Sequence, residues 1–340
     1  MVSFQHQLSG SLQERGMSVT YDLDEPGLTA ILVIGGTRRL LDLWRARQKG
    51  VPIVQRLDGM NWLHRIRRTG VRHYLRSEYG NLVLRIIRRR IASRIVYQSE
   101  FSRQWWERQA GITPVPNAVI YNGVDLEMFH PREGQERPED RYRLLLVEGS
   151  MMGGYEAGLE VAAALAFGLA ERISQQSPLF ANRPVELTVV GRVAEDVRAR
   201  WTQRFQETGR RQSVGIRWVG QVPRQEIPGI DRSAHVYYSA DINAACPNAV
   251  IEALACGLPV VAFDTGALPE LVAEGSGRVV AYGADPWKLE APDVPALVRA
   301  TEEILIDQAA YRQAARDRAE GLFGLDRMVL AYLDQLLASG

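Results

Sequence analysis

The sequence has few of the residues that form covalent cross-links or bind metals. Its two cysteines, Cys246 and Cys256, lie ten positions apart, which is neither a zinc-site spacing nor a disulfide framework. We interpret both as reduced core residues. No segment approaches the roughly 20 apolar residues that cross a bilayer, and no charged-then-apolar signal follows Met1. We therefore expect a cytoplasmic protein, held at most on the inner face of the plasma membrane.

Lysine is also scarce, because Lys49 and Lys288 are the only two in a chain of net charge +1. Positive charge is carried by arginine and is concentrated between Arg65 and Arg94, where Glu78 is the only acid. Three interpretations of this block stay open. Its helices can have a core face and a solvated basic face, or they can lie on anionic lipid headgroups. Binding to nucleic acid or another polyanion is the third, and we do not expect nucleic acid.

Short β-branched runs alternate with amphipathic segments along the chain. They predict strands at residues 19–23, 30–35, 52–57, 94–99, 118–123, 143–149, 186–191, 216–220, 235–240, 259–264 and 277–283. Helical patterns lie between many of these runs, and the last three segments of the chain are helical. This alternation predicts an α/β protein with doubly wound parallel sheets.

Composition also predicts how the chain is divided. A polar, proline-containing segment indicates a linker at 131–141 between an N-terminal domain, 1–130, and a C-terminal domain, 142–321. We expect the final helix, 322–340, to pack back on the first domain. The chain begins with a helix that has Phe4 and Leu8 on one face, whereas a doubly wound domain normally opens with a strand and a Gly-rich turn. Either the start lies too late or the domain lacks that strand, and we favour the first explanation.

The stretch 245–272 holds the clearest candidate for chemistry. Pro247 and Asn248 favour the start of a short helix, expected from Ala249 to about Ala255 and ended by Gly257. Glu252 therefore lies in its first turns, near free N–H groups and the positive end of the helix dipole. Thr265 and Gly266 follow a buried strand, at the sheet edge where open α/β folds bind ligands. The alternative is that Glu252 only favours the dipole and that the other two residues form a turn.

The stretch "PNAVIEALACGLPVVAFDTGALPELV" resembles the donor-site signature of the retaining glycosyltransferases called family 4. The segments "VYQSEFSRQWW" and "VIYNGVDLEMF" are similar to other parts of that family in the same order. The resemblance implies a GT-B fold, with two Rossmann-like domains that face each other across a cleft. It further implies sugar transfer, with retention, from a UDP- or GDP-sugar to a hydroxyl of a cell-surface or lipid-linked glycan. No metal or cofactor is expected.

The same resemblance implies roles for individual residues. Glu252 would hold the ribose of the donor, and Arg192 would clamp its phosphates as a second catalytic residue. The other expected donor-binding residues are Gly149, Gly153, Gly154, Gln221, Val222, Asn248, Thr265 and Gly266.

Two departures from the family pattern affect the predicted activity. The first acid of the signature is replaced by Ala244, and Asp241 lies three residues earlier. The basic residues of the first donor-domain loop are not matched by "EGSMMGGYEAG". A catalytically impaired nucleotide-sugar-binding protein is therefore the alternative. A nicotinamide oxidoreductase is disfavoured, because "VIGGTRRLL" lacks the GxGxxG pattern.

In the N-terminal half, Asp58 follows the predicted strand 52–57. Related transferases often have a histidine there, so the resemblance implies that Asp58 contacts the donor sugar or the acceptor. The alternative is a turn residue that caps the next helix. The other acceptor-side candidates are Arg56, Gly59, Asn61 and His64.

Overall fold

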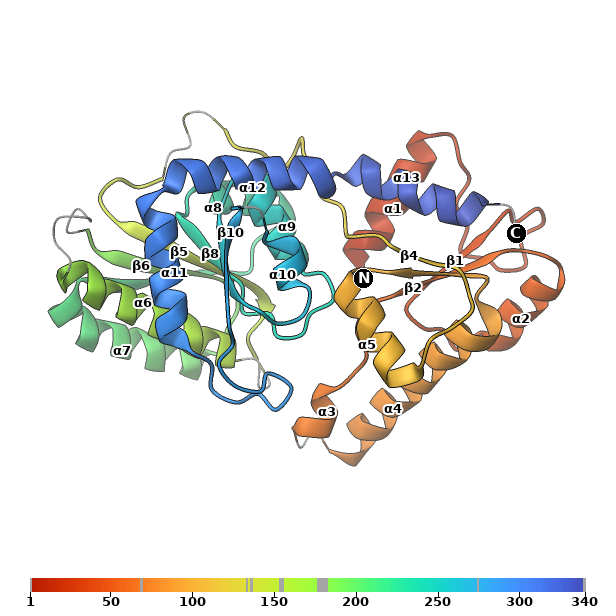
Figure 1. Cartoon of the computed structure of the whole chain (residues 1–340), viewed down its shortest axis with the longest axis horizontal. Helices are drawn as coiled ribbons and strands as arrows, with labels where there is room; N and C mark the ends of the chain where they lie inside the picture. Colours follow the sequence, from red (N-terminus) through yellow and green to blue (C-terminus); the bar gives the residue numbers. More distant parts are fainter. Residues whose placement is uncertain are drawn as a thin grey trace. The chain divides into compact units, whose positions relative to one another are not determined.

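The computed structural model describes residues 2–67, 70–132, 134, 137–152, 156–175, 183–273 and 275–338. Contacts within the chain divide it into two compact units, of which the first comprises Met1–Gly123 with Phe323–Gly340 and the second Val124–Leu322. Each unit contains one parallel sheet (Figure 1). The segment expected to be a linker falls within the second unit in this division.

The first unit has a four-stranded sheet in the order β1-β2-β3-β4, with all neighbours parallel. Its elements are α1 (Val2–Glu14), β1 (Ile31–Ile34), α2 (Leu40–Gln48), β2 (Ile53–Leu57), α3 (Leu63–Ile66), α4 (Val71–Ile86), the π-helical turn η1 (Ile87–Ile91), β3 (Arg94–Tyr97), α5 (Glu100–Ala110), β4 (Asn117–Val119) and α13 (Leu325–Leu337).

The first and last helices of the chain share the core of this unit. Phe4 of α1 packs on Tyr332 of α13, with ring centroids 5.1 Å apart, and both belong to a buried cluster with Val54 of β2 and Val96 of β3. Every residue of β2 is buried, including the polar Gln55 and the charged Arg56. The ends of the chain thus cover the same sheet.

The prediction of a strand at 19–23 is wrong, and this segment forms irregular turns instead. Tyr21 is 69% exposed, so it adds little to the core. The Thr20 hydroxyl accepts from the Asp22 N–H at 3.1 Å, and the Asp22 carboxylate accepts from the Asp24 N–H at 3.1 Å. These hydrogen bonds to short polar side chains occupy backbone N–H groups that pairing with another strand would need. The other ten predicted runs each overlap a strand.

The second unit has a six-stranded parallel sheet in the order β10-β9-β8-β5-β6-β7. Its elements are β5 (Tyr142–Ser150), α6 (Ala157–Gln175), β6 (Val185–Arg192), α7 (Glu195–Gln212), β7 (Val214–Gly220), the 3₁₀ turn η2 (Arg224–Glu226), α8 (Ile227–Arg232), β8 (Val236–Tyr238), α9 (Asn248–Ala255), β9 (Val260–Phe263), α10 (Leu268–Leu271), β10 (Gly277–Val280), α11 (Val294–Ile306) and α12 (Gln308–Leu322).

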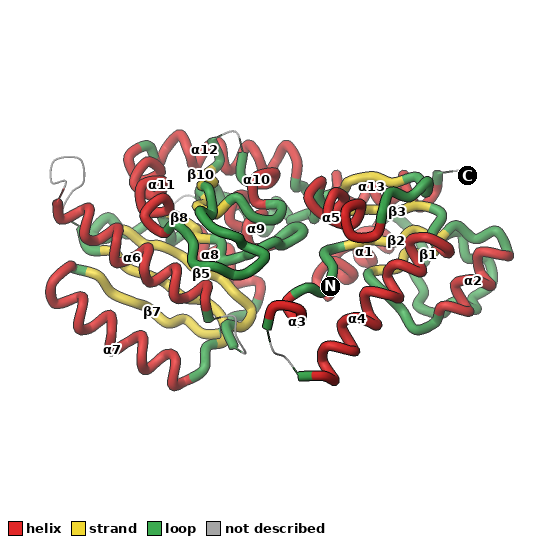
Figure 2. The backbone as a smooth tube through the Cα atoms, turned by 60° about the horizontal axis from the view of Figure 1, so that its bottom comes forward, coloured by secondary structure: helices red, strands yellow, loops and turns green. Residues whose placement is uncertain are grey.

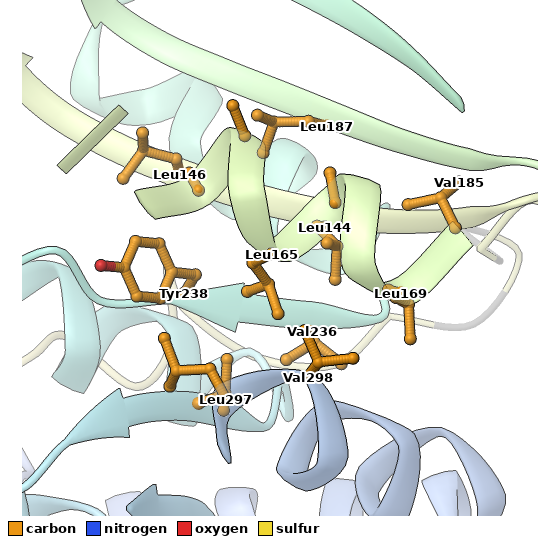
Figure 3. Packing of buried hydrophobic residues seen from close by; sticks show 14 of the residues in the cluster. Leu144, Leu146, Leu165, Leu169, Val185, Leu187, Val236, Tyr238, Leu297 and Val298 are labelled. Atoms are coloured by element: carbon orange, nitrogen blue, oxygen red, sulfur yellow. The ribbon is translucent and has the colours of Figure 1, made fainter. Parts of the chain in front are cut away.

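Strand order makes a switch point in this sheet. The chain proceeds outward from β5 through β6 to β7, then returns to the other side of β5 with β8. On one face, strand residues such as Leu144 and Val236 pack against Leu165 of α6 and Leu297 of α11 (Figure 3). Figure 2 shows helices alternating with strands in the second unit. The helices pack on the sheet, and loops form the edge at the carboxyl ends of its strands. That edge is the usual ligand site of this architecture.

Candidate functional site

Two acids lie at the switch point of the second sheet. Glu148 is near the carboxyl end of β5, and Asp241 follows the neighbouring strand β8. The two strands are held in register, with Leu145 opposite Tyr237, and the Tyr237 hydroxyl donates to the carbonyl of Val147 at 3.4 Å. Parallel pairing therefore brings together acids that are 93 positions apart in the sequence.

Burial makes both carboxyl groups weak acids. Burial and, as a smaller contribution, the nearby charge of Asp241 together raise the pKa of Glu148 to about 8. Burial also raises the pKa of Asp241 to about 6, against a lowering contribution from the Ser239 hydroxyl, which donates to Asp241 Oδ2 at 3.3 Å. The pair therefore prefers to hold a proton at neutral pH, and one carboxyl remains a hydrogen-bond donor.

Glu252 occupies the second turn of α9, where the helix was predicted from the sequence. Its Oε1 accepts a hydrogen bond from an Arg224 Nη at 2.6 Å, which links α9 to the turn η2 after β7. The Arg224 guanidinium also lies 5.3 Å from the ring centroid of Phe129. Burial raises the pKa of Glu252, whereas Arg224 lowers it. The sequence interpretation missed Arg224, although it lies three residues after Gln221, at the same sheet edge.

The loop that contains Ala244 is held by the turn after β9. Thr265 is buried and donates through its hydroxyl to the Asp241 carbonyl at 3.2 Å, and the Ala267 N–H donates to the Ala244 carbonyl at 2.9 Å. Gly266 has φ +60°, and a Cβ on it would lie 2.5 Å from the Ala244 oxygen. Thr265 and Gly266 therefore fix the position of the Asp241 loop.

Asn243, in the same loop, has an unsatisfied donor. It has φ +55° and is 4% exposed. No described residue accepts a hydrogen bond from its Nδ2. A buried amide N–H without an acceptor costs free energy. An oxygen-rich ligand that accepts from Asn243 Nδ2 would remove this cost.

The remaining donor-side candidates lie at the same carboxyl edge. Arg192 ends β6 with an exposed side chain, and its carbonyl accepts from the Met151 N–H at 2.8 Å. Gln221 Nε2 donates to the Gly149 carbonyl at 3.5 Å, and Val222 is partly exposed beside it. Asn248 is exposed where α9 begins. The predicted residues Gly153 and Gly154 lie outside the described residues.

In the first unit, Asp58 directly follows β2. Its carbonyl accepts from Trp106 Nε1 at 2.6 Å and from the Ser102 hydroxyl at 3.2 Å. Burial raises the pKa of its carboxyl, partly offset by Arg56. A Cβ on Gly59 would lie 2.3 Å from the ring of Trp105, so a side chain there would displace α5.

The other candidates of the first unit differ in access. Arg56 is 4% exposed, lies 3.8 Å over the ring of Phe4 and donates to Asn122 Oδ1 at 2.7 Å. His64 is also buried, with Nε2 2.8 Å from Glu78 Oε1. Asn61 is exposed, and its backbone is held at both polar groups by the side chain of Asn81. Asp58 and Asn61 are therefore the accessible members, and their role stays a prediction.

Neither a cluster of metal ligands nor a membrane-spanning helix occurs among the described residues. No group of three or more His, Cys, Asp or Glu side chains within these ranges could hold a metal ion. Among the helices that the structure describes, none is both long and apolar enough to cross a membrane.

The chain resembles known proteins in sequence. Residues 166–307 match the family model described as glycosyl transferases group 1. A D-inositol 3-phosphate glycosyltransferase of Streptomyces bingchenggensis is 27% identical over 199 residues, which cover 57% of this chain and 43% of that protein. The lipopolysaccharide core biosynthesis mannosyltransferase LpcC of Rhizobium leguminosarum is 29% identical over 235 residues, which cover 65% of this chain and 59% of LpcC. The chain thus spans less than two thirds of the length of these relatives.

Solved structures are similar over nearly the whole chain. WaaG, a glycosyltransferase involved in lipopolysaccharide biosynthesis, has a TM-score of 0.65 at 14% identity, covering 99% of this chain and 96% of WaaG. Anabaena Alr3699/HepE in complex with UDP and glucose has a TM-score of 0.64 at 16% identity, covering 91% of this chain and 78% of HepE. At these identities the likeness concerns the fold.

Proposed function

We propose that the chain is a glycosyltransferase, because residues 166–307 match the glycosyl transferases group 1 model and the fold is of the predicted GT-B type. Its donor is a nucleotide diphosphate sugar, and its acceptor is a hydroxyl of a cell-surface or lipid-linked glycan. The observation that carries this proposal is the group of polar residues at the carboxyl edge of the second sheet, which comprises Glu252 with Arg224 and the Glu148–Asp241 pair. UDP in HepE and the lipopolysaccharide role of WaaG and LpcC support the donor and acceptor classes.

In this proposal, Glu252 accepts hydrogen bonds from the ribose hydroxyls of the donor. A carboxylate there is suited to the task because it is partly buried and already aligned by Arg224 at 2.6 Å. The N–H groups at the start of α9 and the exposed Arg192 face anionic oxygens of the diphosphate. Charge that develops on the leaving phosphate is then stabilised by groups fixed before the reaction.

In this proposal, the Glu148–Asp241 pair replaces the first acid of the family signature, at whose position this chain has Ala244. A protonated carboxyl can donate to one sugar hydroxyl while its ionised neighbour accepts from another. The buried Nδ2 of Asn243 adds a further donor in the same loop. This set would hold the transferred sugar, which contributes the binding energy that the missing acid would have supplied.

The proposed reaction proceeds with retention and needs no protein base. The bond between the anomeric carbon and the phosphate oxygen breaks, and the acceptor oxygen bonds to the same face of that carbon. The acceptor proton moves to the departing phosphate oxygen, so the nucleoside diphosphate leaves with it. Asp58, on the acceptor side, orients an acceptor or sugar hydroxyl in this scheme.

Turnover and stereochemistry test the proposal. UDP- and GDP-sugars are incubated with lipid-linked and lipopolysaccharide-core acceptors, and release of the nucleoside diphosphate is followed. NMR of the product gives its anomeric configuration. We expect transfer with the configuration of the donor. Inversion would refute the mechanism, and binding of a sugar nucleotide without turnover over the whole panel would favour the impaired binding protein.

A further inference from the structure

Helix α4 exposes apolar side chains that a surface helix normally buries. Val71, Leu75, Tyr79 and Leu82 are 76, 62, 52 and 52% exposed. Their spacing of four, four and three residues puts them on one face of the helix. Tyr74, 43% exposed, lies nearby. We call these five residues the α4 stripe.

The stripe is additional to the face by which α4 packs on its own unit. Ser77, Asn81, Val83 and Leu84 of the same helix are buried. Ser77 and Leu84 lie on the opposite part of the helix circumference, and Asn81 and Val83 lie at the two borders between the buried face and the stripe. The core of the unit therefore does not need the α4 stripe, and its exposure calls for an external contact.

Arginines border the stripe. Arg72 and Arg76 are exposed and lie three residues before Leu75 and Tyr79, so they follow one side of it. Arg85, three residues after Leu82, borders the other side. No described acid forms an ion pair with any of these three arginines.

Glu78 is the only acid between Arg65 and Arg94, and basic side chains already balance its charge. Glu78 accepts from Arg65 Nε at 2.6 Å and lies 2.8 Å from His64 Nε2. Its pKa is lowered to about 2 by these two partners, so it remains ionised and paired. The border of the stripe consequently keeps its positive charge.

Helix α2 continues this character beyond the end of α4. It exposes Leu41 and Trp44, and the exposed Arg45 beside them lies 3.4 Å from the carboxylate of Asp42. An Arg47 Nη donates to the carbonyl of Arg90, which ties the end of α2 to η1. Both Figure 1 and Figure 2 show α2 past the carboxyl-terminal end of α4.

We propose that the α4 stripe, with α2 beside it, docks the protein on a bilayer surface that contains anionic lipids. Helices with an apolar face and flanking arginines lie in the headgroup region, where the apolar side chains enter the acyl boundary and the guanidinium groups bind phosphate. Tyrosine and tryptophan favour the same depth. A nucleic acid would match the arginines and leave the leucines in water, so lipid fits the whole surface better.

Vesicle flotation tests the docking without any sugar donor or acceptor. The full chain is mixed with phosphatidylcholine vesicles that contain or lack phosphatidylglycerol, at low and high salt. We expect partitioning that requires the anionic lipid and falls as salt is raised. Failure of this test leaves the proposed glycosyl transfer intact, because turnover on a soluble acceptor is measured separately.

Paired variants separate the two components of the surface. Arg72→Gln with Arg76→Gln should weaken partitioning about thirty-fold, at about 1 kcal/mol per charge. Leu75→Gln with Leu82→Gln should weaken it about tenfold or more, since the inserted area is lost. The control is Arg108→Gln with Ile112→Gln, an exposed arginine and an 83% exposed isoleucine of the same unit, which should leave partitioning unchanged.

Several outcomes would overturn the proposal. They are equal partitioning of the stripe variants and wild type, an equal loss in the control, indifference to anionic lipid, and tighter binding to an RNA oligonucleotide than to vesicles. A stable dimer that the leucine variants dissociate would assign the stripe to a second copy of this chain instead. Thermal melts of each variant verify that the fold is retained.

Discussion

Replacing Gly266 by alanine should destabilise the second unit by an amount that the structure allows us to calculate. Gly266 has φ +60°, and an alanine in this conformation costs about 1–2 kcal/mol. The added Cβ would also lie 2.5 Å from the Ala244 oxygen and 2.6 Å from the Ala244 nitrogen. Both contacts are with backbone that cannot rotate away, which adds about 1–3 kcal/mol.

The matched control is Gly220→Ala in the same unit. Gly220 has φ +81°, and no atom lies within 4 Å of the position that its Cβ would take, so only the conformational cost of about 1–2 kcal/mol applies. Urea unfolding of both variants gives the two free energies, with equal m-values expected. Gly266→Ala should be the less stable variant by about 1–3 kcal/mol. Equal destabilisation would refute the conclusion that the turn after β9 holds the Asp241 loop by direct contact.

Three further predictions concern ionisation and buried hydrogen bonds. The pKa of Glu148 is raised from 4.5 to about 8, so its contribution to stability is greatest below pH 4.5 and is lost as the pH rises through 8. Glu148→Gln should therefore flatten that part of the profile of unfolding free energy against pH. The lowered pKa of Glu78, about 2, has the opposite sign, so Glu78→Gln should abolish a loss of stability between pH 4.5 and 2 in the first unit. Tyr97→Phe removes the hydroxyl that accepts from Arg88 Nε at 2.9 Å, and chemical denaturation should show a cost of about 1–3 kcal/mol because Arg88 is fully buried. An unchanged profile or free energy would contradict the respective prediction.

The sequence predicted the architecture well because it depends on local patterns. Ten apolar runs overlap strands, and the helix containing Glu252, expected from Ala249 to about Ala255, spans Asn248–Ala255. The exception, 19–23, has the β-branched pattern of a strand. Its backbone is held by Thr20 and Asp22 side chains, and a period-two pattern does not reveal this competition.

The candidate site was less predictable because its members come from distant strands. Glu148 and Asp241 meet only when β5 pairs with β8, and that pairing depends on strand order rather than on local sequence. Arg224 likewise reaches Glu252 from the turn after another strand. Arg56 was a candidate by its position at the end of a strand, yet the structure buries it under Phe4 of α1, a contact across 52 positions.

Calorimetric titration of UDP and GDP into wild type and Glu252→Gln tests the central claim most directly. If Glu252 holds the ribose, the variant should bind the preferred nucleotide about 10- to 150-fold more weakly, through loss of charged hydrogen bonds worth about 1.5–3 kcal/mol. Glu195→Gln, an exposed acid at the start of α7, should bind like wild type. Wild-type affinity in a folded Glu252→Gln variant would contradict the account.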